Sequence, residues 1–310
     1  MTESPQQCGL CKTKTGFVLK EKFKEYSLWE CPKCFGQFWF PMISPSSDWY
    51  EKDERYSFRN QNPLRKPERN HNEFLKDLPA QGGKLLDVGM GTGNFLTAAV
   101  NKGYDCYGID FDTDAINAAR EVLGLKNVYA LDIDEAIKKF GNDYFDVVTM
   151  FEVLEHLDNP SDFIEKTKLL LKDEGYLALS VPYRRALDIL KPHDKPPRHL
   201  TRWDEKAIKN FITERGFEII RIKIIPVSLP YLITKFHFWF RGFLSFNLIN
   251  KMAKENGAEV VLKKDNLKWL RKLARFKDYL FFGIPAVLFL FFLYASGRRG
   301  LGLYVLAKKV

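Results

Sequence analysis

Runs of apolar residues that end in a glycine or a carboxylate recur through the middle of this chain. Stretches with an apolar side at helical spacing separate these runs, so strand and helix alternate. This alternation predicts an α/β fold whose parallel sheet is covered by helices. The runs that predict buried strands are 85–88, 104–110, 127–134, 145–151, 175–182 and 217–225.

The first of these strands runs into a glycine turn. Residues 85–96 read LLDVGMGTGNFL, so Asp87 is followed by Gly89, Gly91 and Gly93 and then by a helix-like segment. Such a turn lets a ligand approach the backbone, with free N–H groups of the helix N-terminus directed at it. The spacing G-x-G-x-G differs from the G-x-G-x-x-G of dinucleotide sites, which ranks NAD below a ligand without a pyrophosphate. A tight connection with no ligand is the alternative.

The glycine turn resembles the first motif of class I S-adenosylmethionine-dependent methyltransferases. The resemblance covers roughly residues 68–225 and the last ten residues. It implies a Rossmann-like, seven-stranded methyltransferase sheet and S-adenosylmethionine as the cofactor. It also implies that Asp87, Gly89, Gly91 and Gly93 belong to the cofactor site.

Two carboxylates at strand ends are further cofactor-binding candidates. Asp110 lies about 20 residues beyond the glycines, where a carboxylate can accept hydrogen bonds from both ribose hydroxyls. The resemblance assigns Asp110 the same role and places Asp132 beside the adenine amino group. Asp134 is also available, and either Asp132 or Asp134 can instead cap the next helix.

The segment after the strand at 145–151 carries an E-x-x-E-H pattern made by Glu152, Glu155 and His156. In a helical turn these side chains would share a face and could bind a divalent cation or transfer protons. The stretch resembles the ubiquinone-biosynthesis O-methyltransferase subgroup, in which this triad is associated with magnesium. The three residues are therefore candidate Mg²⁺ ligands; the alternative is that Glu155 and His156 only shape the cofactor pocket.

Three residues are candidate catalytic bases. Glu152 and His156 belong to the triad, and His199 precedes a predicted helix where relatives place residues on the acceptor side. A structural role for His199 is the alternative.

Four cysteines near the N-terminus predict a metal site. Cys8, Cys11, Cys31 and Cys34 have the spacing C-x2-C-x19-C-x2-C, which suits a four-thiolate zinc site between two knuckles. Alternating residues between the pairs predict a hairpin, so residues 1–40 are interpreted as a zinc ribbon with structural Zn²⁺. Two redox-active C-x-x-C motifs are the alternative, and the N-terminus shows no secretory signal.

The remaining segments complete a predicted domain order. A linker or lid at 41–66 contains Trp49, Tyr50, Tyr56 and Phe58, which either cover a substrate or pack between domains. The predicted order is then a methyltransferase domain at 67–225, a membrane-associated insertion at 226–300, and the final strand of the methyltransferase sheet at 301–310.

The insertion is hydrophobic and basic. Residues 226–310 hold 15 Lys and Arg against 4 Asp and Glu, a net charge of +11. Residues 265–277 predict a basic amphipathic helix, and Tyr279 to Gly297 is an uncharged stretch of 19 residues. A single span would separate the last strand from its sheet. Pro285 interrupts the apolar run, which favours a re-entrant or interfacial hairpin over a span; a soluble lid or dimerisation arm is the alternative.

Together these features predict a methyltransferase on the cytoplasmic side of a membrane, acting on an oxygen of a hydrophobic or lipid-linked acceptor. A non-catalytic, membrane-anchored zinc-ribbon scaffold is one alternative. An RNA methyltransferase is another, but residues 1–225 carry a net charge of −2 and show no basic surplus for a nucleic acid.

Overall fold

A computed structural model describes residues 4–14, 16–45, 60, 67–190, 194–245 and 264–310. The chain divides into two compact units. The first contains Met1–Arg184, Lys191–Ile225 and Gly302–Val310, and the second contains Arg185–Leu190 and Pro226–Leu301. The four aromatic residues of the predicted lid, at 49, 50, 56 and 58, lie outside the described residues, as does the part of the insertion at 246–263.

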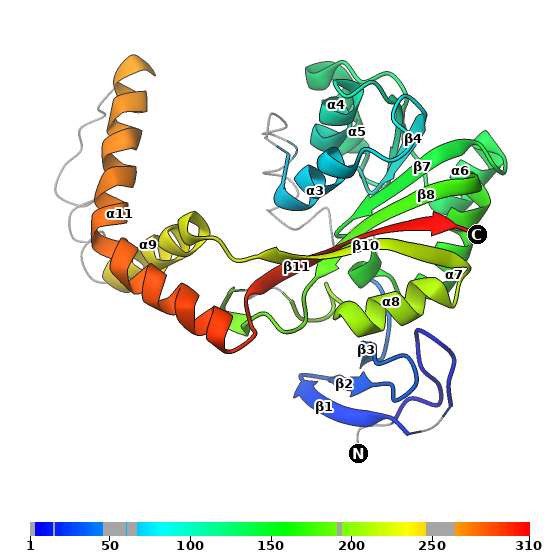
Figure 1. Cartoon of the computed structure of the whole chain (residues 1–310), viewed down its shortest axis with the longest axis horizontal. Coiled ribbons are helices and arrows are strands. Elements are labelled where there is room, and N and C mark those ends of the chain that lie inside the picture. The colour runs from blue at the N-terminus through cyan, green and yellow to red at the C-terminus, as the bar shows by residue number, and fades with distance from the viewer. Residues whose placement is uncertain (1–3, 15, 46–59, 61–66, 191–193, 246–263) are drawn as a thin grey trace. The chain divides into compact units, whose positions relative to one another are not determined.

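A seven-stranded mixed sheet lies at the centre of the first unit (Figure 1). The strand order is β10-β11-β8-β7-β4-β5-β6, with parallel pairing from β8 to β6 and antiparallel pairing of β11 with β8. This confirms the predicted Rossmann-like methyltransferase sheet, including its last strand. The strands are β4 (Lys84–Val88), β5 (Asp105–Asp110), β6 (Val128–Ala130), β7 (Phe145–Phe151), β8 (Leu171–Pro182), β10 (Phe217–Pro226) and β11 (Gly300–Lys309).

Helices cover both faces of this sheet, and the strands are therefore apolar on both sides. Leu85 and Leu86, neighbours on β4, are both fully buried and belong to two different core clusters. Successive side chains of a strand point to opposite faces, so a continuous apolar run marks a strand covered twice. The helices are α3 (Arg69–Asp77), α4 (Asn94–Val100), α5 (Thr113–Leu123), α6 (Ile133–Phe140), α7 (Pro160–Leu170) and α8 (Glu205–Thr213).

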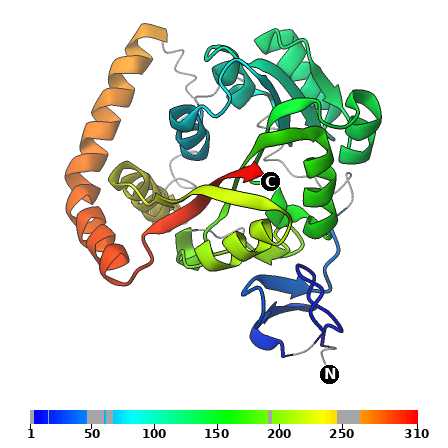
Figure 2. The same cartoon turned by 45° about the vertical axis from the view of Figure 1, so that its right-hand side comes forward.

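The N-terminal segment forms a second, antiparallel sheet. Strands β1 (Val18–Phe23), β2 (Tyr26–Glu30) and β3 (Gln37–Phe40) make the predicted hairpin and one further strand. A two-residue strand far along the chain, β9 (Thr201–Arg202), pairs with β3 and completes the sheet. Figure 2 shows this blue sheet beside the yellow-green helix α8. The ribbon therefore shares a sheet with the segment that follows His199.

The second unit contains two helices, α9 (Leu229–Ser245) and α11 (Lys264–Ala295), which pack on each other. Their shared core contains Leu232, Ile233, Ala286 and Leu293 together with Leu190 of the one-turn helix η2 (Asp188–Leu190). Helix α11 continues through Pro285, so the expected interruption at this proline is wrong. A proline removes a single N–H donor, and α11 is otherwise rich in helix-forming residues. The side chains of the predicted basic helix at 265–277 lie outside the described residues.

Within the described parts of the chain, none of the helices combines the length and the apolar character required to cross a bilayer.

Candidate functional site

A cavity of about 420 Å³ opens where strands β4, β5, β6 and β7 end. Ligands of open α/β sheets bind at this edge, outside the carboxyl ends of the strands. The wall is mostly apolar, with a few polar groups placed at strand ends. Its residues are Ser44, Val88, Gly89, Ile109, Asp110, Phe111, Leu131, Asp132, Ile133, Asp134, Glu152, Val153, His156, Leu157 and Phe163.

Of the three glycines of the turn, Gly89 lies on the cavity wall. Its φ is +71°, and a Cβ there would lie 2.6 Å from Cγ2 of Val153. Gly93 is required for packing instead, because a Cβ would lie 2.4 Å from Cδ1 of Leu125. Gly91 has a φ of +55°, and its N–H donates a hydrogen bond to the carboxylate of Asp110. The turn therefore serves both the cavity and the contact between α4 and α5.

Asp110 at the end of β5 is held by two backbone donors. Gly91 N donates to Oδ2 at 2.8 Å and Asp112 N donates to Oδ1 at 3.0 Å, and the residue is only 6% exposed. A carboxylate has about four acceptor positions, so both oxygens can accept further hydrogen bonds. This geometry suits the predicted contact with the two ribose hydroxyls.

Asp87 lies beneath the turn rather than on the cavity wall. Its Oδ1 accepts a 2.7 Å hydrogen bond from Oγ1 of Thr149. Burial raises the pKa of Asp87 to about 8, and the nearby Asp110 carboxylate adds to this shift, while the Thr149 hydrogen bond opposes it. The position makes Asp87 a support for the turn, and its predicted contact with cofactor stays a prediction.

Asp132 lies on the cavity wall and also caps helix α6. Its Oδ1 accepts a 2.8 Å hydrogen bond from Glu135 N, and the Glu135 side chain accepts one from Asp132 N, which is a capping box. The cap explains why β6 ends at Ala130, earlier than the run 127–134 predicts. Asp134, the other adenine-side candidate, pairs with Lys166 at 2.8 Å.

The segment after β7 does not form the helical turn that the E-x-x-E-H pattern suggested. Glu152 has a φ of +57°, in the left-handed region, and a single 3₁₀ turn, η1 (Leu154–His156), follows it. Glu152 is exposed on the cavity wall and its Oε1 accepts a 3.1 Å hydrogen bond from Ser180 Oγ. The expectation of one helical face shared by Glu152, Glu155 and His156 is therefore wrong.

Both histidines of the site are held through Nδ1. His156 Nδ1 lies 2.7 Å from the Arg198 carbonyl oxygen, and His199 Nδ1 lies 2.7 Å from Oδ1 of Asp194. Their rings are perpendicular with centroids 4.7 Å apart. Burial lowers the pKa of His156 to about 3, and the nearby His199 adds to this shift. His156 lines the cavity; His199 lies behind it.

The structure gathers Glu155, His156 and His199 as a possible ligand set, with one ligand atom from each within 4.8 Å of the others. Glu152, the first residue of the predicted magnesium triad, is not in this group. The carbonyl of Glu155 accepts a 2.7 Å hydrogen bond from Leu200 N, which brings the segment of His199 against the turn after β7. The sequence reasoning missed Asp194, because its pairing with His199 depends on a loop conformation.

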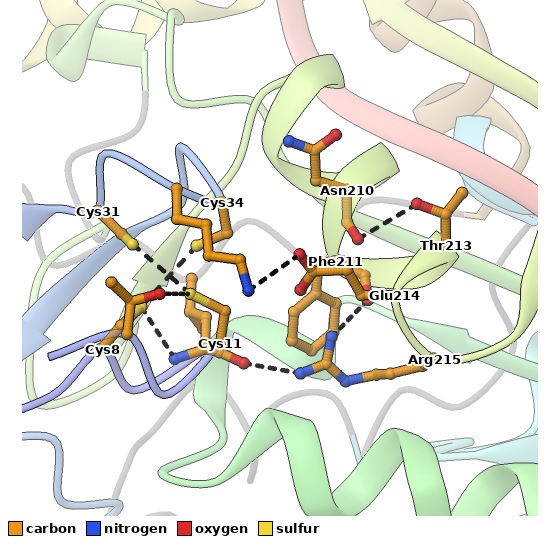
Figure 3. A network of polar contacts seen from close by, with 12 residues as sticks. Cys8, Cys11, Cys31, Cys34, Asn210, Phe211, Thr213, Glu214 and Arg215 are labelled. Atoms are coloured by element: carbon orange, nitrogen blue, oxygen red, sulfur yellow. Dashed lines mark hydrogen bonds and ion pairs between the residues drawn. The ribbon is translucent and has the colours of Figure 1, made fainter.

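The four cysteines converge as predicted (Figure 3). The Sγ atoms of Cys8 and Cys34 are 3.8 Å apart and those of Cys11 and Cys31 are 3.6 Å apart. A tetrahedral zinc ion with Zn–S bonds near 2.3 Å separates its sulfurs by about 3.8 Å, so the residues fit this ion. Leu10 N also donates to Cys8 Sγ at 3.3 Å, as in a zinc knuckle.

A buried arginine connects the cysteine ribbon to the domain that contains the seven-stranded sheet. Arg215 donates from Nη2 to the Leu10 carbonyl and to Ser161 Oγ, both at 2.7 Å, and from Nη1 to the Phe211 carbonyl. Nearby, Lys33 of the ribbon and Glu214 form an ion pair at 3.8 Å (Figure 3). The ribbon is thereby anchored to the end of α8.

Comparison with known proteins agrees with this architecture. A family described as "Methyltransferase domain" matches residues 58–222, just over half of the chain. The chain therefore belongs to this family, the class I S-adenosylmethionine-dependent methyltransferases. A solved S-adenosylmethionine-dependent methyltransferase from Archaeoglobus fulgidus has the same fold, with a TM-score of 0.50 and 16% identity over 84% of this chain and 99% of that one.

Two relatives carry the name "Ubiquinone biosynthesis O-methyltransferase". The one from Glaesserella parasuis serovar 5 is 32% identical over 112 residues, 34% of this chain and 48% of the relative. The one from Actinobacillus pleuropneumoniae serotype 7 is 36% identical over 106 residues, 32% of this chain and 45% of the relative. The chain thus spans about half the length of the curated relatives that it matches.

Proposed function

We propose that this protein transfers a methyl group from S-adenosylmethionine to an oxygen of a hydrophobic or lipid-linked acceptor at the cytoplasmic surface of a membrane. The observation that supports S-adenosylmethionine as the methyl donor is the fixed carboxylate of Asp110, which lies with Gly89 at one wall of the cavity. When bound, S-adenosylmethionine supplies an electrophilic methyl group.

The residues of the cavity have distinct roles in this proposal. Asp110 accepts hydrogen bonds from the ribose hydroxyls, and Asp132 marks the adenine side. Phe111, which is 51% exposed, and the apolar wall around Phe163 provide surface for the adenine ring and exclude water. Exclusion of water and fixed orientation are the main contributions that a methyltransferase makes to catalysis.

Glu152 is the group that receives the proton of the acceptor hydroxyl. It lies on the wall, carries a carboxylate held by Ser180, and has a strained backbone of the kind found at functional sites. A general base must lie within hydrogen-bond reach of the proton that it removes. His199 does not line the cavity and is left out of this role.

The second unit supports a membrane-bound acceptor. One side of α11 exposes a series of large apolar side chains at helical spacing, while the opposite side packs in the core shared with α9. The exposed residues are Leu280, Phe281, Ile284, Val287, Leu288, Phe291 and Phe292. Such a face, in a segment with a net charge of +11, suits an anionic membrane surface. The names of the two relatives support an oxygen as the methyl acceptor.

Calorimetric titration with S-adenosylmethionine tests the cofactor site. Wild type should bind in the micromolar range and Asp110→Ala should lose at least tenfold in affinity. Asp114→Ala is the matched control, because Asp114 is exposed on the first turn of α5 and does not line the cavity. Absence of binding to a folded wild type would reject the enzyme and favour the scaffold alternative.

Transfer of labelled methyl to lipid extracts, with total RNA as a comparison, tests the acceptor. Label in an organic-soluble product that mass spectrometry identifies as a methyl ester or a methyl ether is the expected result. Label that appears only in RNA would overturn the proposed acceptor class.

A further inference from the structure

The geometry points to a second metal site, for a Zn²⁺-class transition-metal ion, formed by Glu155, His156 and His199. It differs from the cysteine site in its ligands, and from the predicted magnesium triad in the metal and in one ligand, with His199 in place of Glu152. It does not depend on the proposed methyl transfer.

The two imidazoles are oriented as metal ligands are. A carbonyl oxygen can only accept, so His156 Nδ1 must donate its proton to the Arg198 carbonyl at 2.7 Å. His199 Nδ1 likewise donates to the Asp194 carboxylate at 2.7 Å. In each neutral ring this leaves the lone pair on Nε2. Outer hydrogen bonds from Nδ1 to a carbonyl or a carboxylate are the usual support of metal-bound histidines.

The third ligand is a carboxylate without exposure to solvent. Glu155 is fully buried, and its Oε1 lies 3.9 Å from Nε2 of His156. The ligand atoms of all three residues lie within 4.8 Å of one another. A tetrahedral ion with bonds near 2 Å holds its ligands about 3.3 Å apart, so small rotations of these side chains would close the site.

The donor set decides the class of the ion. Magnesium demands octahedral oxygen coordination and keeps several waters, whereas two imidazoles and one carboxylate suit zinc and related ions. The triad of the resembling subgroup requires Glu152, whose carboxylate is instead held by Ser180 and whose backbone leaves the turn in a left-handed conformation. The residues therefore do not fit the magnesium site and do fit a nitrogen-rich one.

At this position an ion would connect two segments that are distant in the sequence. His199 precedes β9, which pairs with the ribbon, while Glu155 and His156 follow β7 at the cavity. An ion would hold these two distant segments together at the wall of the cavity. Three protein ligands also leave a fourth coordination position for water or an acceptor oxygen.

The number of metal ions bound per chain tests this site. Protein produced in medium supplemented with Co²⁺ or Zn²⁺ should contain two ions per chain by elemental mass spectrometry. His199→Asn and Glu155→Gln should each contain one, with the thiolate-to-cobalt absorption of the ribbon unchanged. His237→Asn, in helix α9, is the matched control and should keep two.

Asp194→Asn provides a variant that keeps all three ligands. It should weaken the affinity for the second ion about 10- to 100-fold while the ribbon keeps its ion. One ion in wild type, two ions in His199→Asn, or displacement of the second ion by excess Mg²⁺ would each overturn the assignment. Calorimetry with S-adenosylmethionine on the same samples separates this result from a failure of the proposed function.

Discussion

The backbone N–H of Trp39, in the ribbon strand β3, donates a 2.8 Å hydrogen bond to the carbonyl of Leu200. The N–H of Leu200 in turn donates to the carbonyl of Glu155, beside the cavity. One residue therefore links the ribbon to the wall of the candidate active site. A change in the structure of the ribbon should therefore alter the structure of the candidate active site.

We expect the four cysteines to hold a structural zinc ion, and loss of this ion should loosen β9. A structural zinc site supplies on the order of 10 kcal/mol of folding free energy, and β9 has only two residues of its own. Cys31→Ser, which disables this site alone, should speed amide hydrogen exchange at residues 199–203 while β4 and β7 stay protected. Unchanged protection at Leu200 in this variant would contradict the coupling.

Gly89→Ala should weaken S-adenosylmethionine binding at least tenfold. The new Cβ would lie 2.6 Å from Val153, and a φ of +71° costs an L residue about 1–2 kcal/mol. Gly124→Ala is the matched control, because its φ is +67° but no heavy atom lies within 4 Å of the added Cβ. Gly124→Ala should lose about as much stability from backbone strain as Gly89→Ala and should keep the wild-type affinity for S-adenosylmethionine. Equal affinities of the two variants for S-adenosylmethionine would argue against a ligand at Gly89.

Glu152→Gln should lower the rate of methyl transfer about 10²- to 10⁴-fold, the range typical for loss of a general base. The amide can still accept the Ser180 hydrogen bond, so the affinity for S-adenosylmethionine should change by less than about threefold. Steady-state transfer rates and calorimetry on the same sample check both parts. A full rate in the variant would remove Glu152 from the chemistry.

Asp87 should make stability depend on pH. Burial raises its pKa in the folded state to about 8 from an ordinary value of 3.8, so the folded state binds the extra proton. Its contribution to the unfolding free energy is complete below pH ~4 and falls by about 1.4 kcal/mol per pH unit as the pH rises toward ~8. Unfolding free energies measured with urea across this window should fall less steeply with pH for Asp87→Asn than for wild type. The same dependence on pH in both proteins would show that Asp87 ionises freely.

The exposed side of α11 should bind membranes. Ile284 and Leu288 are 73% and 67% exposed, and burying a side chain of this size contributes about 1.5–3 kcal/mol. The double variant Ile284→Ser, Leu288→Ser should therefore bind vesicles of phosphatidylcholine and phosphatidylglycerol at least tenfold more weakly in flotation. Ile220→Ser, an exposed residue of β10, is the control. Equal flotation of all three proteins would reject a membrane role for this face.

Much of the fold could be predicted from the order of residues because its signals are local. Continuous apolar runs marked strands buried on both faces, as Leu85 and Leu86 illustrate. The glycine turn and the carboxylate at the end of β5 were predicted together, since the carboxyl ends of adjacent parallel strands meet at one edge of the sheet. The cysteine spacing predicted the convergence of the four thiols for a similar reason, because each C-x-x-C pair is a local turn.

The rest depended on contacts between distant segments. Glu152 was expected on a helical face, but it has a left-handed backbone and accepts a hydrogen bond from Ser180, which lies 28 residues further along the chain. His199 joined Glu155 and His156 only because Leu200 bridges two segments, and hydrogen bonds of this kind leave no period or spacing in a sequence. Local propensity thus determined the sheet and the cofactor turn, whereas long-range packing determined which polar side chains meet around the cavity.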